Sequence, residues 1–331
     1  MILRLLAKLY ELLLRTTRPI GVEYFCKLFN SRPLPIVSLP ASVKTQVRIF
    51  IPFKDSWEVT ERCLNALLAQ RNYRVKMDIT LISNNSSQSS MDLATEWISG
   101  QANRQSAELI TFNAPFNFSK ICNLALSKQK CQSPSSYYLF LNNDVLLEQD
   151  NSLDLVTEFA ETNPDCGPVG VTLLYPSRKI QHLFAAPGVK IIAAHPFKGR
   201  SPSILKDWNL RSRQVPAITG AFLMIASEAF QEAGGFDENL PTTGQDIDFC
   251  LRLQIKGRNS WVVPSVQAIH LESVSRRGQR ISKLEVDYIH KKWKSLLTSH
   301  PDLPNEISRW SEQPVYRLLE GAYPYQLLLP G

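Results

Sequence analysis

The chain has 331 residues, of which 44% are hydrophobic and 20% charged. This composition is typical of a folded globular protein and excludes a mainly disordered, collagenous or coiled-coil chain. Its apolar runs have the length of strands, and none reaches the roughly 20 uninterrupted apolar residues of a membrane-spanning helix. The net charge of +7 favours anionic partners without naming one. Six scattered cysteines without zinc-type spacing favour a reducing compartment.

The amino-terminal segment, residues 1–17, predicts a basic amphipathic helix with leucines on one face and basic side chains largely on the other. Its recurrent charges argue against a secretory signal. Such a helix either lies in the face of an anionic membrane or packs on protein, and periodicity alone does not separate these alternatives. A proline-rich linker follows at residues 31–42, so residues 1–45 are expected to form an arm outside the main domain.

Strands and helices then alternate along the chain. The buried or extended strand runs are residues 47–51, 77–82, 108–112 and 137–141, and the helical stretches are residues 57–70, 91–98 and 119–127. Repeated βα units predict an α/β fold in which a mostly parallel twisted sheet carries helices on both faces. Ligands of such sheets bind beyond the carboxyl ends of the strands. Neither a dinucleotide-binding glycine fingerprint nor a P-loop is present, which argues against dehydrogenases and kinases.

The strand at residues 137–141 runs directly into Asn142, Asn143 and Asp144. Mg²⁺ and Mn²⁺ prefer oxygen ligands, and one or two carboxylates together with a substrate diphosphate commonly hold them. This turn therefore suits a divalent cation. Taken alone, the same three residues are more typical of a turn that caps the next helix.

Two more carboxylates follow Gly244 on a predicted helix. Asp246 lies in the first turn, where the helix dipole stabilises the ionised form, and this suits either a plain cap or a general base. Asp248 and Arg252 are four residues apart, a spacing that predicts a structural ion pair. Farther along, an extended segment ends at His270, whose imidazole is either structural or a metal ligand.

Taken in order, these segments resemble the family-2 inverting glycosyltransferases of the GT-A fold, and most closely their rhamnosyltransferase-like branch. The resemblance extends from Val47 to about Arg276. It is carried by residues 51–55, 83–86, 116–119 with 123, 141–144, 180–182, 219–221, 234–238, 244–252, and 270 with 273, 275 and 276. It implies a GT-A glycosyltransferase domain over residues 46–276. Beyond it the sequence pattern predicts a C-terminal helical extension over residues 277–331, with a helix at residues 281–297.

The resemblance also implies roles for single positions. Asp144 and His270 match metal-binding positions, Asn142 stands where a first acid is common, and Asp246 matches the catalytic base. The residues implied to contact the donor are Pro52, Phe53, Asp55, Ser83, Asn84, Asn117, Asn123, Asn142, Asn143, Thr219, Gly220 and Ala221.

Two positions depart from the family pattern. Ser83 occupies the place of an aspartate that hydrogen-bonds the nucleotide base, and Gln245 stands where an acid is common. A serine lacks the charge-assisted hydrogen bond of a carboxylate. The base is therefore left open among UDP-, dTDP- and GDP-linked sugars.

The implied activity is transfer of a sugar from a nucleoside-diphosphate sugar to a hydroxyl of a glycan or lipid-linked acceptor in cell-surface polysaccharide synthesis. The implied cofactor is Mn²⁺ or Mg²⁺. The expected location is the cytoplasm, at the inner face of its membrane if the amino-terminal helix binds anionic lipid. The basic loop at residues 187–216 either covers the donor, faces an anionic acceptor or is solvated.

Three other classes of function are alternatives to a glycosyltransferase: a non-catalytic domain, a nucleotidyltransferase and a nucleic-acid-binding protein. The main alternative is a non-catalytic GT-A domain that binds a nucleotide or glycan, or scaffolds a polysaccharide assembly complex. A nucleotidyltransferase normally has a glycine-rich basic loop after its first strand, and residues 52–56 are not such a loop. No nucleic-acid partner is expected, because the basic residues are not interleaved with aromatic residues in a known module.

Overall fold

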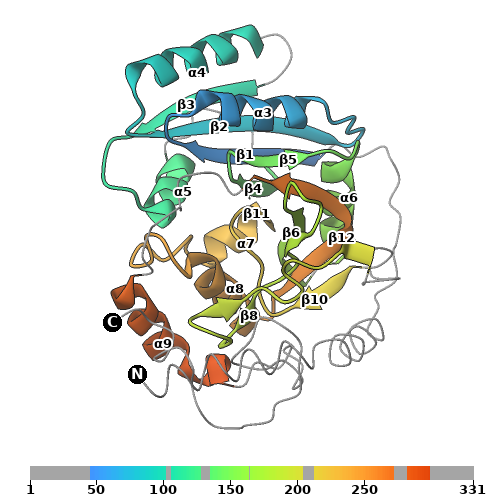
Figure 1. The fold of residues 1–331 in the computed structure, drawn as a ribbon, viewed down its shortest axis with the longest axis vertical. Coiled ribbons are helices and arrows are strands. Elements are labelled where there is room, and N and C mark those ends of the chain that lie inside the picture. The colour runs from blue at the N-terminus through green and yellow to red at the C-terminus, as the bar shows by residue number, and fades with distance from the viewer. Residues whose placement is uncertain are drawn as a thin grey trace.

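The computed structural model describes residues 45–101, 106–127, 135–163, 165–203, 212–271 and 282–298. A ten-stranded sheet forms the centre of this part of the molecule, with helices on both sides (Figure 1). The predicted amino-terminal helix, the linker, Arg276 and the end of the C-terminal extension lie outside the described residues. No helix among the described residues combines the length and apolar character needed to cross a membrane.

The first half of the sheet is the parallel βα array that the sequence predicts. Its elements are β1 (Thr45–Phe53), α3 (Trp57–Leu68), β2 (Val75–Asn84), α4 (Gln88–Gln101), β3 (Ser106–Phe112), α5 (Phe118–Ser127) and β4 (Tyr137–Leu141). The strands lie in the order β3, β2, β1, β4, and neighbours are parallel. Phe53 pairs with Ser83, and Phe50 pairs with Phe140. The carboxyl ends of β2, β1 and β4 therefore meet at one edge.

The second half is mixed in direction. Its elements are β5 (Val145–Leu147), α6 (Ser152–Thr162), β6 (Cys166–Leu174), β7 (Ile180–His182), β8 (Ala186–Pro187), β9 (Ala193–Ala194), β10 (Arg213–Val215), β11 (Phe222–Ala226), α7 (Ser227–Glu232), α8 (Gln245–Ile255), β12 (Asn259–His270) and α9 (Lys283–Thr298). Strand β11 lies antiparallel between β4 and β6, whereas β6 and β12 are parallel. The predicted α/β fold is confirmed, and its parallel arrangement is cleanest in β1 to β4.

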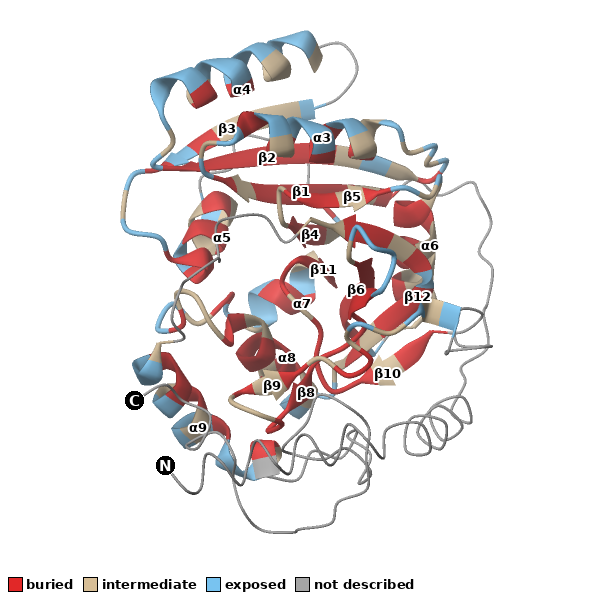
Figure 2. Cartoon of the chain, viewed as in Figure 1, coloured by how far each residue is buried: buried red, intermediate tan, exposed pale blue. Residues whose placement is uncertain are grey.

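Successive side chains of the central strands pack alternately in two hydrophobic cores, one on each face of the sheet. Ile49 and Ile51 of β1 belong to the core that includes residues of α3 and α6, whereas Phe50 belongs to the core that includes residues of α5 and α8. Figure 2 shows the central strands β1, β4 and β6 mostly buried, while β3 at the sheet edge is mostly intermediate or exposed and the outer faces of α3 and α4 are exposed. This alternation is the sheet period of two, and it explains why the central strands are apolar on both faces.

The C-terminal helix α9 packs on the main domain. Val286, Ile289 and Leu297 are buried in the same core as residues of α8. A Cβ atom added at Gly244 would lie only 2.2 Å from Ile289 Cδ1, so a residue with a side chain would clash with α9. Gly244 also has a positive φ of 79°, which glycine adopts without strain. The helix therefore borders the turn that leads into α8.

Much of the basic loop at residues 187–203 is also packed rather than solvated. Val189, Ile192, Ala194 and Phe197 are buried in the core of α8 and α9. Strands β8 and β9 form a small separate hairpin there. These contacts exclude the fully solvated form of the loop over residues 187–203, whereas residues 204–211 lie outside the described part.

Candidate active site

Asp144 and His270 meet because β4 and β12 end at the same edge of the sheet. The chain turns after β4 and forms β5, in which Val145 pairs antiparallel with His270. The Leu271 N–H donates a 3.0 Å hydrogen bond to the main-chain oxygen of Asp144. His270 Nε2 consequently lies 3.1 Å from Asp144 Oδ1. Asp144 and His270, the two residues implied as metal ligands, are thus neighbours in space although 126 positions separate them in the sequence.

This pair fits a divalent cation that also binds a substrate. Asp144 is 5% exposed, and an imidazole nitrogen and a carboxylate oxygen are both ligands for Mn²⁺ or Mg²⁺. Within the described parts of the chain, no group of three or more His, Cys, Asp or Glu side chains could hold a metal ion. Two protein ligands would leave coordination positions for water and a substrate diphosphate, which is how Mg²⁺ is commonly held.

The two asparagines before Asp144 are anchored in different ways. The Asn142 main-chain N–H donates to Ala221 O at 3.0 Å, and its carbonyl accepts from the Cys63 thiol at 3.7 Å. The Asn143 side-chain amide donates to Thr60 Oγ1 of α3 at 2.9 Å. These contacts fix the turn between β4 and β5, and hence the position of Asp144.

Asp246 lies in the first turn of α8, facing the segment that precedes β11. Its Oδ2 accepts a 3.0 Å hydrogen bond from the Gly220 main-chain N–H, and its Oδ1 accepts one of 2.9 Å from Ile247 N–H. Asp246 is only half-buried, in contrast to the fully buried Asp248. The side chain is thus oriented by main-chain donors while it keeps contact with solvent, as a general base for an incoming hydroxyl requires.

Residues Thr219, Gly220 and Ala221 connect Asp246 to the turn that carries Asp144. Gly220 bonds Asp246, and Ala221 bonds the main chain of Asn142. This juxtaposition follows from topology, because the amino end of β11 lies beside the carboxyl end of its antiparallel neighbour β4. The family resemblance implies that these three residues border the donor sugar and the acceptor, and the structure places them between Asp246 and the β4 turn.

The residues implied to line the nucleotide pocket gather at the ends of β1 and β2. Phe53 packs edge to face on Trp57, at 5.9 Å between ring centroids, and pairs with Ser83 in the sheet. Pro52 is half-buried beside it. The Asn84 side chain donates to the carbonyl oxygens of Phe112 and Ala114, so its nitrogen holds the turn after β3.

Asp55 connects two turns at the same edge. Its Oδ1 accepts a 2.7 Å hydrogen bond from the Ser87 main-chain N–H, just before α4 begins. That hydrogen bond is the main cause that lowers the pKa of the Asp55 carboxyl below its usual value. The described contacts of Asp55 thus join the β1 turn to the β2 turn.

Asn117 and Asn123, implied to lie on the diphosphate side, hold the segment at residues 235–240. Asn117 Oδ1 caps α5 by accepting from Lys120 N–H, and its Nδ2 donates to Glu238 O. Asn123 exchanges two hydrogen bonds with the Phe236 main chain, at 2.9 and 3.0 Å. The side-chain nitrogens of both asparagines are therefore engaged within the protein.

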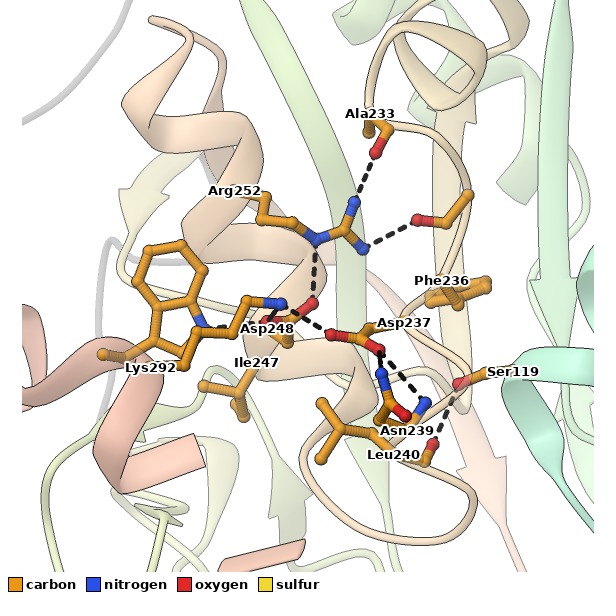
Figure 3. Close-up of polar contacts among 12 residues, drawn as sticks. Ser119, Ala233, Phe236, Asp237, Asn239, Leu240, Ile247, Asp248, Arg252 and Lys292 are labelled. Carbon is orange, nitrogen blue, oxygen red and sulfur yellow. Dashed lines mark hydrogen bonds and ion pairs between the residues drawn. The ribbon is translucent and has the colours of Figure 1, made fainter. Parts of the chain in front are cut away.

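Asp248 has a structural environment, as its spacing from Arg252 predicts. It is fully buried, and Arg252 Nε donates to it at 2.8 Å. Lys292 Nζ of α9 lies 2.7 Å from Asp248 and 2.6 Å from Asp237, so this one ammonium joins two carboxylates (Figure 3). Trp293 Nε1 donates the third hydrogen bond to Asp248 at 2.8 Å.

The α9 contacts were not foreseen from the sequence. Glu285 accepts hydrogen bonds from Thr242 N–H, Thr242 Oγ1 and Thr243 N–H, all at 2.8 Å, directly before the α8 start at Gly244. The helical period of the sequence predicts α9, but it does not indicate which residues of the main domain α9 contacts. Gln181, which contacts His270, was recognised only as part of the family pattern and without a role.

Comparisons with known proteins identify the family and the fold of this chain. The chain is 32% identical over 266 residues to the O-antigen biosynthesis protein RfbC of Myxococcus xanthus, which covers 77% of this chain. The chain spans 20% of the length of that relative.

Two solved structures share the fold. A mannosyltransferase of Pyrobaculum calidifontis, in complex with GDP-Man and Mn²⁺, has a TM-score of 0.58 at 12% identity over 85% of this chain and 78% of its own. Residues 1–349 of TarS of S. aureus, in complex with UDP-GlcNAc, have a TM-score of 0.53 at 14% identity over 78% of this chain and 68% of their own. These likenesses show a GT-A fold. The model of the "Glycosyltransferase like family 2" matches residues 45–284, and the chain therefore belongs to glycosyltransferase family 2.

Proposed function

We propose that this chain is an inverting glycosyltransferase that moves a sugar from a nucleoside-diphosphate sugar to an acceptor hydroxyl. The observation that carries the proposal is the convergence of three side chains within a family-2 domain. Asp144 and His270 form a pair at 3.1 Å, and Asp246 is linked to the turn of that pair through the main chain at residues 220–221. A metal position and a base position thus flank one short segment of backbone.

In this mechanism Asp246 accepts the proton of the acceptor hydroxyl as that oxygen attacks the anomeric carbon. The hydrogen bonds from the Gly220 and Ile247 main-chain N–H groups hold the carboxylate in a fixed orientation at the start of α8. Attack from the side opposite the leaving diphosphate inverts the anomeric centre, as in single-displacement glycoside hydrolysis.

Asp144 and His270 are the residues that would hold Mn²⁺ or Mg²⁺. Such a cation would stabilise the negative charge that develops on the departing diphosphate. The buried carboxylate of Asp144 and the imidazole of His270 supply two ligands, and the turn anchored at Thr60 and Ala221 fixes the carboxylate. Pro52, Phe53, Asp55, Ser83 and Asn84 are proposed to face the nucleotide.

The finer identity of the substrates is also part of the proposal. The acceptor is a glycan or lipid-linked hydroxyl in cell-surface polysaccharide synthesis, which the O-antigen relative supports. The branch is rhamnosyltransferase-like, on the pattern of motifs in the sequence. The proposed location is the cytoplasm, with peripheral contact to anionic membrane through residues 1–17.

The second candidate function is a non-catalytic GT-A domain that binds a nucleotide or glycan. Two observations favour it: Ser83 replaces the base-binding acid, and the asparagine amides at residues 117 and 123 are engaged within the protein. The juxtaposition of Asp144, His270 and Asp246 favours catalysis, because a binding module has no need of a solvent-accessible base beside a metal position.

Release of nucleoside diphosphate from UDP-, dTDP- and GDP-linked sugars, with Mn²⁺ or with EDTA, separates the two candidates. We expect slow hydrolysis of one donor that needs Mn²⁺, is lost in Asp144→Ala and is kept in Asp150→Ala, whose carboxylate lies exposed in an ion pair with Arg71. Binding of a donor without release, also when glycan acceptors are added, would favour the non-catalytic function.

A further inference from the structure

Gln181 of β7 lies against His270 on the side away from Asp144, and nothing in the mechanism above uses it. Its side-chain Oε1 is 2.5 Å from His270 Nδ1, and its Nε2 is 3.5 Å from the main-chain oxygen of His270. We propose that Gln181 is a positioning residue that selects the His270 tautomer able to bind a divalent cation. This inference rests on the proposed function.

The orientation of the Gln181 amide follows from what each neighbouring atom can do. A main-chain carbonyl oxygen only accepts hydrogen bonds, so the amide nitrogen is the group that faces the His270 carbonyl. The amide oxygen then faces His270 Nδ1. Because this oxygen only accepts, the proton of the neutral ring lies on Nδ1.

The other ring nitrogen is thereby left with its lone pair. His270 Nε2 points at Asp144 Oδ1, 3.1 Å away, and a lone pair and a carboxylate repel each other at this distance unless they share a cation. A histidine that binds a metal through one nitrogen usually donates its second N–H to an oxygen acceptor, which fixes the ring and the tautomer. Gln181 provides such an acceptor.

The backbone holds Gln181 rigidly enough for this role. Ile180 exchanges main-chain hydrogen bonds with the segment at residues 199–200, at 2.7 and 2.8 Å. His182 pairs with Leu173 of β6, and its Nδ1 lies 2.7 Å from His195 Nδ1. Gln181 itself is 7% exposed, so water does not readily replace its amide oxygen.

A glutamine elsewhere in the fold provides the matched control. Gln70 Oε1 accepts from Ser152 N–H at 3.0 Å, and its Nε2 faces Leu147 O at 3.5 Å. It therefore bridges a donor and a carbonyl in the same manner, but it joins the end of α3 to the start of α6. Gln70→Met measures the cost of losing such a bridge without touching His270.

The experiment titrates Mn²⁺ by electron paramagnetic resonance, alone and with UDP, dTDP or GDP, on full-length protein. Gln181→Met should weaken Mn²⁺ binding by about 10-fold or more, the usual effect of removing an outer-shell partner of a metal ligand. Gln70→Met should leave the affinity within about twofold, and Gln181→Glu, which keeps an acceptor, should stay closer to the unmodified protein than Gln181→Met. In a His270→Ala background, Gln181→Met should have no further effect.

The outcomes distinguish failure of the inference from failure of the metal site. Mn²⁺ binding by the unmodified protein that is equally strong in Gln181→Met would overturn the role of Gln181. An equal loss in the His270→Ala background would also overturn it, since Gln181 would then not act through the ring. No Mn²⁺ binding by the unmodified protein under any of these conditions would overturn the proposed metal site and the role of Gln181 with it.

If Gln181→Met does not fold, the tautomer of the His270 ring is measured directly in the unmodified protein. Nitrogen-15 shifts of His270 in the unmodified protein with Mg²⁺ and nucleoside diphosphate should report a proton on Nδ1, and a proton on Nε2 would contradict the proposal.

Discussion

Replacing Asp248 with asparagine tests the distinction between the two carboxylates of α8. The side chain is fully buried and accepts hydrogen bonds from Arg252, Lys292 and Trp293, at 2.7 to 2.8 Å. Asparagine keeps the shape but loses the charge, and it presents an N–H₂ group to donors. Breaking a buried ion pair in this way costs about 3 kcal/mol. For a domain of this size the loss lowers Tm by roughly 6–12 °C.

The matched control is Asp287→Asn on α9. Asp287 also forms an i,i+4 ion pair, with Lys283, but its side chain is 47% exposed and that of Lys283 is 73% exposed. Such surface pairs contribute less than about 0.5 kcal/mol. Thermal and urea unfolding of both variants checks the comparison. Equal stability losses, or a fully stable Asp248→Asn protein, would refute the reasoning that Asp248 is the structural carboxylate.

Two further predictions concern the docking of α9. Gly188→Ala should lower the free energy of unfolding by at least about 1 kcal/mol more than Gly199→Ala. Both positions have a positive φ, but only at Gly188 would the added Cβ meet a backbone atom, Leu297 O at 1.8 Å. Similar unfolding midpoints of the two variants would contradict this packing. Partial burial raises the pKa of Asp237, but hydrogen bonds from Lys292 and Tyr288 outweigh it and lower the pKa to about 2, below its ordinary 3.8. The Asp237 carboxylate therefore stabilises the fold above about pH 4 and loses this effect as the pH falls towards 2, so the stability difference between unmodified protein and Asp237→Asn should shrink over that range; a difference that stays constant would refute it.

The sequence predicts the parallel half of the fold well because local patterns determine it. The apolar run of β4 and the helical period of α3 carry their own signals. The structure confirms β4 with the predicted bounds, and α3 ends two residues earlier than predicted. The strands β5, β7 and β10 have three residues each, too short to show any period. Their positions depend on pairing with distant strands, which the sequence does not record.

In the candidate site, too, local patterns predict some features, whereas others depend on contacts between distant segments. The sequence motifs predict Asp144, His270 and Asp246 as site residues, and helical spacing predicts the i,i+4 pair of Asp248 and Arg252, which the structure confirms. The partners that orient these groups come from distant segments. Gln181 reaches His270 across 89 positions, a contact that only the tertiary fold creates.

The central claim is that Asp246 is the base of a sugar transfer beside a metal-binding pair. The most direct test measures donor affinity and turnover on the same preparations of unmodified protein and Asp246→Asn, with the donor found in the nucleoside-diphosphate release assay. The account predicts Mn²⁺-dependent donor affinity unchanged within about twofold and turnover lowered by roughly 10²–10⁴-fold, the contribution of a general base. Undiminished transfer by Asp246→Asn would contradict it.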